Sequence, residues 1–275
     1  MPSEKILVTF STPAFWVRQQ FLNLSAIYNR TVDRTEQWNP RRLAKAGFHA
    51  ANPAISLKER GAGYWSWKPF IIEQALKNAS EGDVVLYSDV GRMKVLLLRT
   101  GLEPFLRWMD AEQQDCIPGV RAPWLGPVSK WARRDTLEYF SCAESPWLQE
   151  PPMQASFSIW RKTPATLAFV TEWKECCLNR MLVSDDPNPS RRLDFPDFIT
   201  QYGDQTLLSL LAMKKGLKGL IWETGAPPPF MEKSPEDWLR RFGEAIPNGP
   251  ANWLIAAMAK CYLSFEVLFR ERRVD

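Results

Sequence analysis

The stretch between residues 60 and 91 limits the fold of this chain more than any other part of the sequence. It begins Arg60-Gly-Ala-Gly-Tyr-Trp-Ser-Trp-Lys-Pro69 and, after one helix-length interval, closes with Asp83-Val-Val-Leu-Tyr-Ser-Asp89-Val-Gly91. The second run is an apolar strand pattern that ends on a carboxylate. Open α/β sheets place ligand-binding groups in this way, in the crevice beyond the carboxyl ends of their strands. We therefore expect an α/β fold with a ligand site at the end of this strand.

The composition agrees with one large domain. With 275 residues, of which 45% are hydrophobic and 24% charged, the chain has enough apolar material for a core of its own. The formal net charge of +4 is mild and is spread over short basic pairs. A phosphate-bearing substrate, an anionic membrane surface or a solvated face would each explain such pairs. Because there is no long basic arm, we expect no nucleic-acid partner.

The cysteine and histidine content excludes a conventional histidine-rich zinc site. The chain has five cysteines without any Cys-x-x-Cys pair, and a single histidine, His49. We therefore expect free thiols in a reducing compartment, and His49 as a polar surface residue. No secretory signal precedes the run Ile6–Phe10, and no stretch of about 18 uncharged apolar residues occurs, so we expect a cytoplasmic protein.

Hydrophobic periodicity predicts strands alternating with helices over residues 1–224, which is typical of an α/β domain. The predicted strands are 6–10, 31–38, 83–88, 153–160 and 220–223. The predicted helices are 15–28, 40–46, 67–78, 100–113, 133–140, 163–181 and 204–215, with polar loops at 47–58 and 184–194.

A C-terminal helical extension, residues 225–275, follows this domain, because Gly225 to Pro229 breaks the pattern. Its main feature is a mostly apolar helix predicted at 251–269, which ends in Arg270-Glu-Arg-Arg273. Packing onto the domain, or a homodimer contact, is the plain interpretation of this helix. Its basic end also favours a peripheral contact with an anionic membrane surface.

The Arg60–Pro69 run combines the residue types that bind anionic ligands carrying rings. Glycines let a backbone approach a ligand closely, Arg and Lys bind phosphates, and the helix start near Pro69 adds backbone N–H groups. The aromatic side chains can stack on a base or a sugar, and plugging the core is the structural alternative. This combination indicates a nucleotide sugar. The candidate ligand-binding residues on the run are Arg60, Gly61, Tyr64, Trp65 and Lys68.

Asp89 is the candidate catalytic or metal-binding carboxylate, with Ser88 and Gly91 beside it. At the end of a buried strand it can bind Mn²⁺ or Mg²⁺ carrying a diphosphate, or accept a hydrogen bond from a sugar hydroxyl. An Asx turn is the structural alternative. Position 91 is glycine rather than a second acid, so a metal site here needs ligands from elsewhere in the chain.

Two further pairs of polar residues are candidates. Gln154 and Ser156 lie within an apolar strand pattern and can recognise hydroxyl groups, unless they only face solvent. Asp204 and Gln205 open a predicted helix and can contact the sugar or an acceptor. The structural interpretation of Asp204 is that of an N-cap.

The order of these motifs resembles a family of bacterial GT-A type glycosyltransferases that are encoded with capsule or lipopolysaccharide genes. The resemblance lies in Gly-Tyr-Trp-x-Trp-Lys-Pro, a strand ending in Tyr-x-Asp-x-Gly, a Gln-x-Ser strand and Asp-Gln-Thr-Leu-Leu-Ser, and it covers roughly residues 5–224. The family is similar at a distance to retaining transferases that use nucleotide sugars and carry a DxD motif.

The resemblance implies one Rossmann-like GT-A domain, a mixed central sheet flanked by helices. The implied reaction transfers a hexose from a nucleoside diphosphate sugar, with a UDP-sugar expected first, to a glycan or lipid-linked acceptor in surface polysaccharide synthesis, with retention rather than inversion. Asp89 stands at the DxD position, but the motif is reduced to Ser88-Asp89-Val90-Gly91, so metal dependence is not implied. By the same resemblance, Arg60, Tyr64, Trp65 and Lys68 line the donor side, and Asp204 and Gln205 lie near the transferred sugar or acceptor.

Two other functions stay open from the sequence. The missing second acid and the absence of a late histidine favour a non-catalytic nucleotide- or carbohydrate-binding relative of such enzymes. A nucleotidyltransferase that makes the sugar donor is the third interpretation. It would require a Gly-rich phosphate loop after the first strand, which Ser11-Thr12-Pro13 does not supply.

Overall fold

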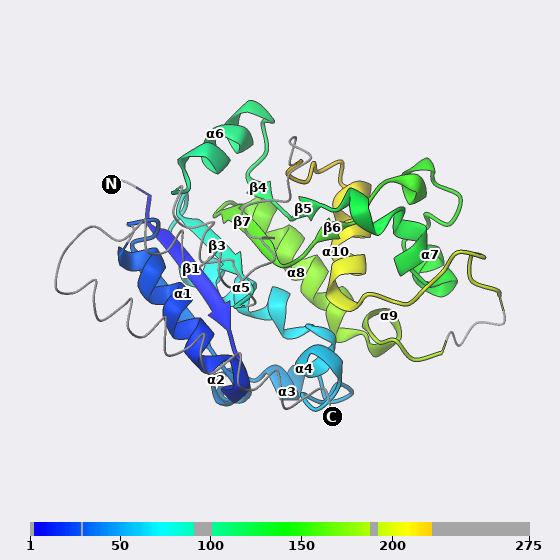
Figure 1. Cartoon of the computed structure of the whole chain (residues 1–275), viewed down its shortest axis with the longest axis horizontal. Helices are drawn as coiled ribbons and strands as arrows, with labels where there is room; N and C mark the ends of the chain where they lie inside the picture. Colours follow the sequence, from blue (N-terminus) through cyan, green and yellow to red (C-terminus); the bar gives the residue numbers. More distant parts are fainter. Residues whose placement is uncertain (1–2, 29, 91–100, 188–191, 222–275) are drawn as a thin grey trace, which may run out of the picture.

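The computed structural model describes residues 3–28, 30–90, 101–187 and 192–221 of the chain. A five-stranded sheet with the strand order β2-β1-β3-β7-β4 forms its centre (Figure 1). Strands β1, β2 and β3 are parallel, β7 is antiparallel to β3, and β4 is antiparallel to β7. The expected α/β fold with a mixed sheet is confirmed. The strands are β1 (Lys5–Phe10), β2 (Arg34–Trp38), β3 (Val84–Ser88), β4 (Cys116–Ile117) and β7 (Phe157–Arg161).

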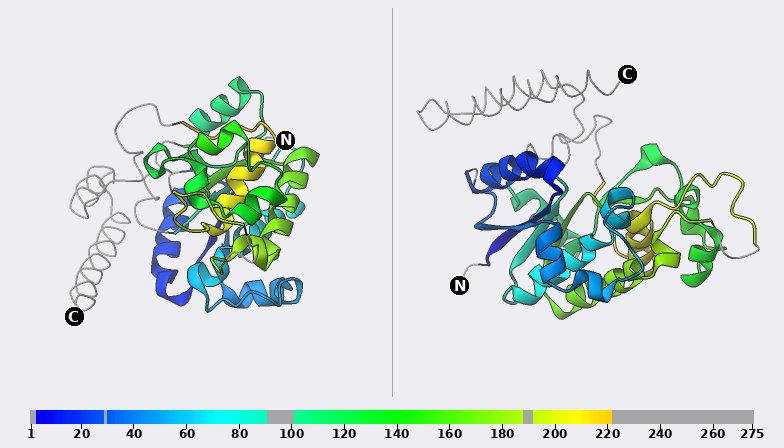
Figure 2. Two further views of the ribbon diagram at one scale, coloured as in Figure 1. Left: turned by 90° about the vertical axis from the view of Figure 1, so that its right-hand side faces the viewer. Right: turned by 90° about the horizontal axis from the view of Figure 1, so that it is seen from below.

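Helices cover both faces of this sheet (Figures 1 and 2). α1 packs on β1 and β2, whereas α5 packs on β1 and β3 and lies along α8. The alternation of side chains along β1 explains both layers, because Leu7 joins the core with α1 and α6, and Val8 joins the core with α5, α8 and α10. The helices are α1 (Trp16–Tyr28), α2 (Pro40–Lys45), α3 (Phe48–Ala51), α4 (Arg60–Tyr64), α5 (Trp67–Asn78), α6 (Glu103–Ala111), α7 (Arg134–Tyr139), α8 (Pro164–Leu178), α9 (Arg180–Val183) and α10 (Gly203–Lys214).

The strand order creates a switch point beside β1. The chain passes from β1 to β2 on one side of β1 and then crosses back over β1 to β3 on its other side, so the two connections run in opposite directions. In open α/β sheets the crevice at such a point, beyond the carboxyl ends of the strands, is where ligands bind. The residue that follows β3 directly is Asp89.

Residues 61–65, which overlap α4, form a left-handed segment before α5. All five have positive φ, from +54° at Ala62 to +89° at Gly63, and three of them carry side chains. Left-handed backbone costs an L-residue roughly 1–2 kcal/mol, so such a run requires support from its surroundings. Part of that support comes from Gly61, whose carbonyl accepts hydrogen bonds from the Trp65 backbone N–H and from Trp67 Nε1.

Two predicted elements are wrong in detail. The strand expected at 153–160 is divided by a turn at Ala155 and Ser156 into β6 (Met153–Gln154) and β7, and β6 pairs with β5 (Val120–Arg121) in a separate two-stranded sheet. A two-residue turn preserves the alternation of apolar residues, so the pattern could not reveal the break.

The helix expected at 163–181 ends at Leu178. There the Asn179 side chain accepts a hydrogen bond from the Met181 backbone N–H and begins the separate helix α9. Similarly, the polar loop expected at 47–58 contains the short helix α3. The other predicted strands and helices up to residue 215 agree with the structure within a few residues.

Several smaller expectations can be compared with the structure. Cys116, Cys142, Cys176 and Cys177 are buried free thiols, and His49 is exposed, as expected. Leu220 forms an isolated parallel bridge with Val120, and Ile221 has no regular secondary structure. Residues 222–223 of the strand expected at 220–223, the extension 225–275 with its helix at 251–269, and Gly91 lie outside the described residues. Within the described ranges, every helix is too short or too polar to cross a membrane.

Gly61→Ala tests the left-handed segment. A methyl group at this position would lie 2.4 Å from a Trp65 ring atom, and the φ of +62° is itself unfavourable for alanine. We expect a loss of about 2–5 kcal/mol in the free energy of unfolding, measured with urea, as the sum of the left-handed penalty and overpacking.

Gly82→Ala is the matched control for this substitution. Its φ is +86°, but nothing lies within 4 Å of an added methyl group, so we expect a loss of only about 1–2 kcal/mol. Equal losses in the two variants would contradict the packing of Trp65 on Gly61.

Candidate functional site

The site is built around the carboxyl end of β3. Asp89 follows Ser88, the last residue of the strand, and its backbone N–H donates to the Ser156 carbonyl at 2.9 Å, which extends the contact between β3 and the β7 side of the sheet. The Ser88 hydroxyl donates to the Asp89 carbonyl at 3.2 Å. These bonds hold the backbone of Asp89 beside the switch point.

A buried ion pair lies behind Asp89. Lys68 Nζ is 2.8 Å from Asp204 Oδ2, and the two side chains are only 4% and 3% exposed. Lys68 comes from the first turn of α5 and Asp204 from the first turn of α10, so the pair joins two helix N-termini. A helix N-terminus favours a carboxylate and disfavours an ammonium group. The Asp204 carboxylate therefore offsets the unfavourable position of the Lys68 ammonium.

Asp89 is held by this pair and by a tyrosine. Its Oδ1 lies 3.7 Å from Lys68 Nζ and accepts a hydrogen bond of 2.5 Å from the Tyr87 hydroxyl. Lys68 Nζ also lies 5.4 Å from the centre of the Tyr87 ring. We call Lys68, Tyr87, Asp89 and Asp204 the lysine–carboxylate cluster. Of these four side chains Asp89, at 30% exposed, is the one that reaches solvent.

Burial and charge set the protonation of the cluster. Burial raises the pKa of Asp204 to about 6, although the Lys68 ammonium opposes this rise. Burial also lowers the pKa of Lys68, but the charges of Asp204 and Asp89 outweigh it and hold that pKa above its ordinary value. Burial and then the charge of Asp89 raise the pKa of Tyr87 well above its usual range, so the phenol keeps its proton. At neutral pH the cluster therefore contains one cation and two carboxylates.

Glycine contacts fix the left-handed segment against α10. A methyl group on Gly203 would lie 2.9 Å from the Tyr64 carbonyl oxygen and 3.5 Å from a Trp65 ring atom, and the φ of Gly203 is +53°. The first turn of α10 therefore rests directly on the segment that leads into α5. This close approach helps to bring Lys68 and Asp204 together.

The structure places the predicted donor-side residues in different environments. Arg60 is exposed and pairs with Asp185 at 3.2 Å, and Trp65 is half-buried. Tyr64 is buried, with its hydroxyl 3.5 Å from Glu59, and this position does not suit a ring that stacks on a ligand. Gly61 makes room for the Trp65 ring rather than for a ligand.

The remaining candidates divide between the cluster and its surroundings. Ser88 and Ser156 contact Asp89 through the bonds described above, but Gln154 lies in the two-stranded sheet, opposite Val120. Gln205 is buried beside Asp204, and its Nε2 finds no hydrogen-bond partner among the described residues.

One expectation for a charged residue requires correction. Asp204 is not the N-cap of α10, because Tyr202 occupies that position and Asp204 lies within the first turn. Lys68 lies in the first turn of α5, within the helix expected at 67–78, and its buried ammonium faces carboxylates. A direct contact between Lys68 and a donor phosphate is therefore disfavoured.

Sequence reasoning missed Tyr87 and Gly203 as parts of the site. Tyr87 could have been found, because alternate residues of a strand share a face and Tyr87 precedes Asp89 by two positions. No sequence signal for Gly203 exists beyond the glycine itself, since its role arises from contact with the distant Tyr64 carbonyl.

The described side chains do not fit a divalent cation held by the protein alone. Mg²⁺ and Mn²⁺ take about six ligands, largely carboxylate, carbonyl and water oxygens. Here Asp204 is closed off by Lys68, Asp89 shares Oδ1 with Tyr87, and the Lys68 ammonium would repel a second cation. Within the described ranges no group of three or more His, Cys, Asp or Glu side chains is arranged to hold a metal.

Comparison with known proteins adds no assignment. No protein-family model matches the chain, and no curated protein matches it significantly.

Lys68→Met tests the buried pair. The substitution leaves Asp204 buried without its cation, and we expect a loss of about 3–5 kcal/mol in the free energy of unfolding at pH 7. Lys218→Met is the control, because the pair of Lys218 with Glu112 is exposed and should contribute no more than about 1 kcal/mol. A loss for Lys68→Met as small as that of the control would contradict a buried ion pair.

The pH dependence of Asp204 provides a second test. Its folded pKa of about 6 lies above the unfolded value of about 3.9, so between these values the folded state keeps a proton that the unfolded chain releases. Relative to Asp204→Asn, the free energy of unfolding should therefore fall as pH rises from about 4 to 6, and then stay level. Carbon-13 NMR of the carboxyl group measures the pKa directly, and titration below pH 4 would contradict the assignment.

Proposed function

We propose that this protein is a glycosyltransferase that moves a sugar from a nucleoside diphosphate sugar to a glycan or lipid-linked acceptor. The observation that carries the proposal is the convergence of Lys68, Asp89 and Asp204, from three separate elements, at the switch point of a Rossmann-like sheet. This crevice is the general ligand site of such sheets. The arrangement supports the GT-A interpretation drawn from the motif order.

The charge of the cluster suits the sugar better than the phosphates. One ammonium and two carboxylates give a net charge of −1, which repels a diphosphate but stabilises positive charge that develops on a sugar ring during transfer. Asp89 reaches solvent, and Tyr87 and Lys68 fix its orientation from behind. In the proposed complex, Asp89 accepts hydrogen bonds from hydroxyl groups of the transferred sugar.

The proposed reaction needs no further reagent. The bond between the anomeric carbon and the diphosphate oxygen breaks, and a bond forms from that carbon to the acceptor hydroxyl oxygen. In a retaining reaction the acceptor approaches on the face of the leaving group, and its proton passes to the departing diphosphate oxygen. Arg60 is the exposed cation of the Arg60–Pro69 run, and it would exchange Asp185 for phosphate oxygens.

A non-catalytic nucleotide- or carbohydrate-binding relative is the second candidate. The observation in its favour is that Lys68 closes off Asp204, which leaves Asp89 as the accessible carboxylate of the cluster. Such a protein would bind a nucleotide sugar or a glycan without consuming it.

Asp89→Asn tests the catalytic proposal. We first expect a rise in Tm with one member of a panel of UDP-, GDP-, CMP- and dTDP-sugars, because ligand binding stabilises the native state. With that donor, release of the nucleotide should fall by roughly 10²–10³-fold in the variant, as expected for loss of a positioned charge.

Asp110→Asn is the matched control, since Asp110 is an exposed carboxylate paired with Arg161 away from the cluster. It should keep the wild-type rate. Donor binding without nucleotide release by the wild type, across a range of acceptor glycans, would instead support the non-catalytic candidate. Full activity in Asp89→Asn would refute the site assignment.

A further inference from the structure

Three aromatic side chains form a partly exposed surface next to the lysine–carboxylate cluster. The Arg60 guanidinium carbon lies 5.6 Å from the Trp65 ring centre and 5.6 Å from the Tyr202 ring centre. Tyr202 in turn meets Trp131 edge to face, with ring centres 5.3 Å apart. We call Trp65, Trp131 and Tyr202, with Arg60 over the Trp65 and Tyr202 rings, the aromatic shelf. All three rings are half-buried, whereas most large aromatic residues of the sheet layers are fully buried.

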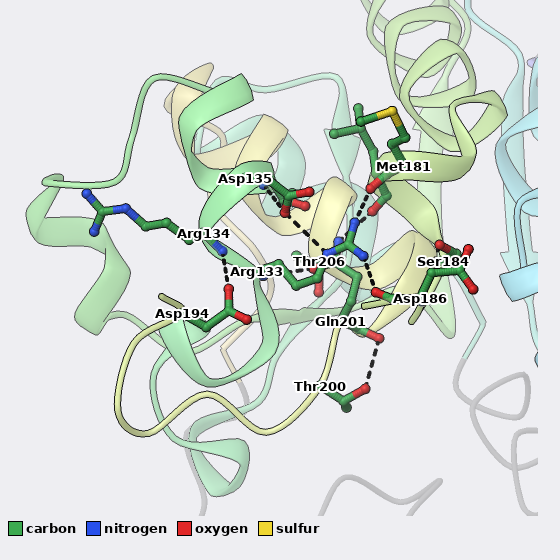
Figure 3. A network of polar contacts seen from close by, with 12 residues as sticks. Arg133, Arg134, Asp135, Met181, Ser184, Asp186, Asp194, Thr200, Gln201 and Thr206 are labelled. Carbon is green, nitrogen blue, oxygen red and sulfur yellow. Dashed lines mark hydrogen bonds and ion pairs between the residues drawn. The ribbon is translucent and has the colours of Figure 1, made fainter. Parts of the chain in front are cut away.

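A buried arginine anchors the chain that carries Tyr202. Arg133 is only 2% exposed, and its guanidinium donates to the backbone carbonyls of Met181 and Asp186 (Figure 3). Its backbone N–H donates to Gln201 Oε1 at 3.0 Å, and Gln201 Nε2 donates to the Leu182 carbonyl at 2.6 Å. The residue before Tyr202 is therefore fixed on two sides.

Hydrogen bonds also join Trp131 and Tyr202, two residues of the shelf that are far apart in the sequence. The Tyr202 backbone N–H is 3.2 Å from the Trp131 carbonyl and 3.2 Å from Thr206 Oγ1, and Thr206 Oγ1 itself donates to the same carbonyl at 2.5 Å. The Trp131 indole N–H donates to the Leu125 carbonyl at 3.0 Å. The rings thus stand on a rigid base, which lowers the entropy that ligand binding costs.

The shelf is continuous with the proposed reaction centre. Tyr202 precedes Gly203 and Asp204 directly, and a Trp65 ring atom lies 3.5 Å from where a Gly203 methyl group would be. Trp131 and Tyr202 belong to the half of the chain that follows β3, whereas the nucleotide side of a Rossmann-like sheet is formed by its first strands. These two rings of the shelf therefore lie toward the acceptor side of the centre, whereas Trp65 and Arg60 come from the part of the chain that precedes β3.

We propose that the aromatic shelf is the subsite for a pyranose ring of the acceptor. A pyranose presents a face of C–H groups, which packs on aromatic rings, and a rim of hydroxyl groups, which hydrogen-bond to charged side chains. Asp185, the carboxylate partner of Arg60, supplies such a charged group beside the rings when Arg60 turns to the donor diphosphate. The proposal rests on the proposed glycosyltransferase function, because only a transferase has an acceptor. Binding of a pyranose to the shelf is nevertheless measurable without turnover.

The test begins with purified full-length protein on an array of pyranose oligosaccharides, followed by calorimetric titration of the strongest binder. We expect Tyr202→Ala to weaken that binding by about tenfold or more, because the stacking surface is lost. Tyr202→Phe should stay within about threefold of wild type, since the ring rather than the hydroxyl makes the contact. Tyr139→Ala, which removes an exposed tyrosine outside the shelf, should leave the affinity unchanged.

A second titration, with uridine monophosphate, distinguishes a shelf that binds an acceptor sugar from a shelf that binds a nucleotide base. We expect Tyr202→Ala to bind the nucleotide as wild type does, and loss of nucleotide affinity in place of sugar affinity would overturn the proposal. It is also overturned if the wild type binds no pyranose, or if Tyr202→Ala binds it normally while Tm shows both proteins folded. Pyranose binding that depends on Tyr202, in a protein that consumes no donor, would support the shelf as a pyranose-binding site and refute the catalytic function.

Discussion

The ion pair between Lys68 and Asp204 is the interaction on which the rest of the site depends. It lies almost entirely out of water, and it joins the first turns of α5 and α10, which are far apart in the sequence. A buried pair of this kind adds little stability over apolar packing, but either partner alone would be strongly unfavourable. The pair therefore fixes how the two helices meet, and through Lys68 it also fixes Asp89 at the end of β3.

The backbone of the left-handed segment 61–65 also helps to bring α5 and α10 together. Its positive φ values are tolerated because Gly61 admits the Trp65 ring, and because Gly203 lets the first turn of α10 approach the Tyr64 carbonyl. Strained backbone of this type persists where the surrounding structure over-determines it, often at functional sites. In this protein the strain, the buried charges and the half-buried Trp65 occur together, which is consistent with a preorganised binding site.

Local pattern was sufficient for much of the fold and for single residues of the site. The apolar run before Asp89 and the helix expected at 67–78 are both present, because periodicity and strand-end position are local properties. The division of residues 153–160 between two sheets escaped prediction, since a two-residue turn leaves the alternation intact. The sequence also could not show that Lys68 faces Asp204 rather than a phosphate, because that depends on how distant helices pack.

The most direct test of the central claim is a crystal structure with the donor identified by thermal shift. If the switch point is a sugar-transfer site, the density of the transferred sugar lies within hydrogen-bond distance of the Asp89 carboxylate, with Lys68 still paired to Asp204. A donor bound elsewhere, with Asp89 contacting only Tyr87 and Lys68, would contradict the claim and leave the lysine–carboxylate cluster as a structural device that joins two helices.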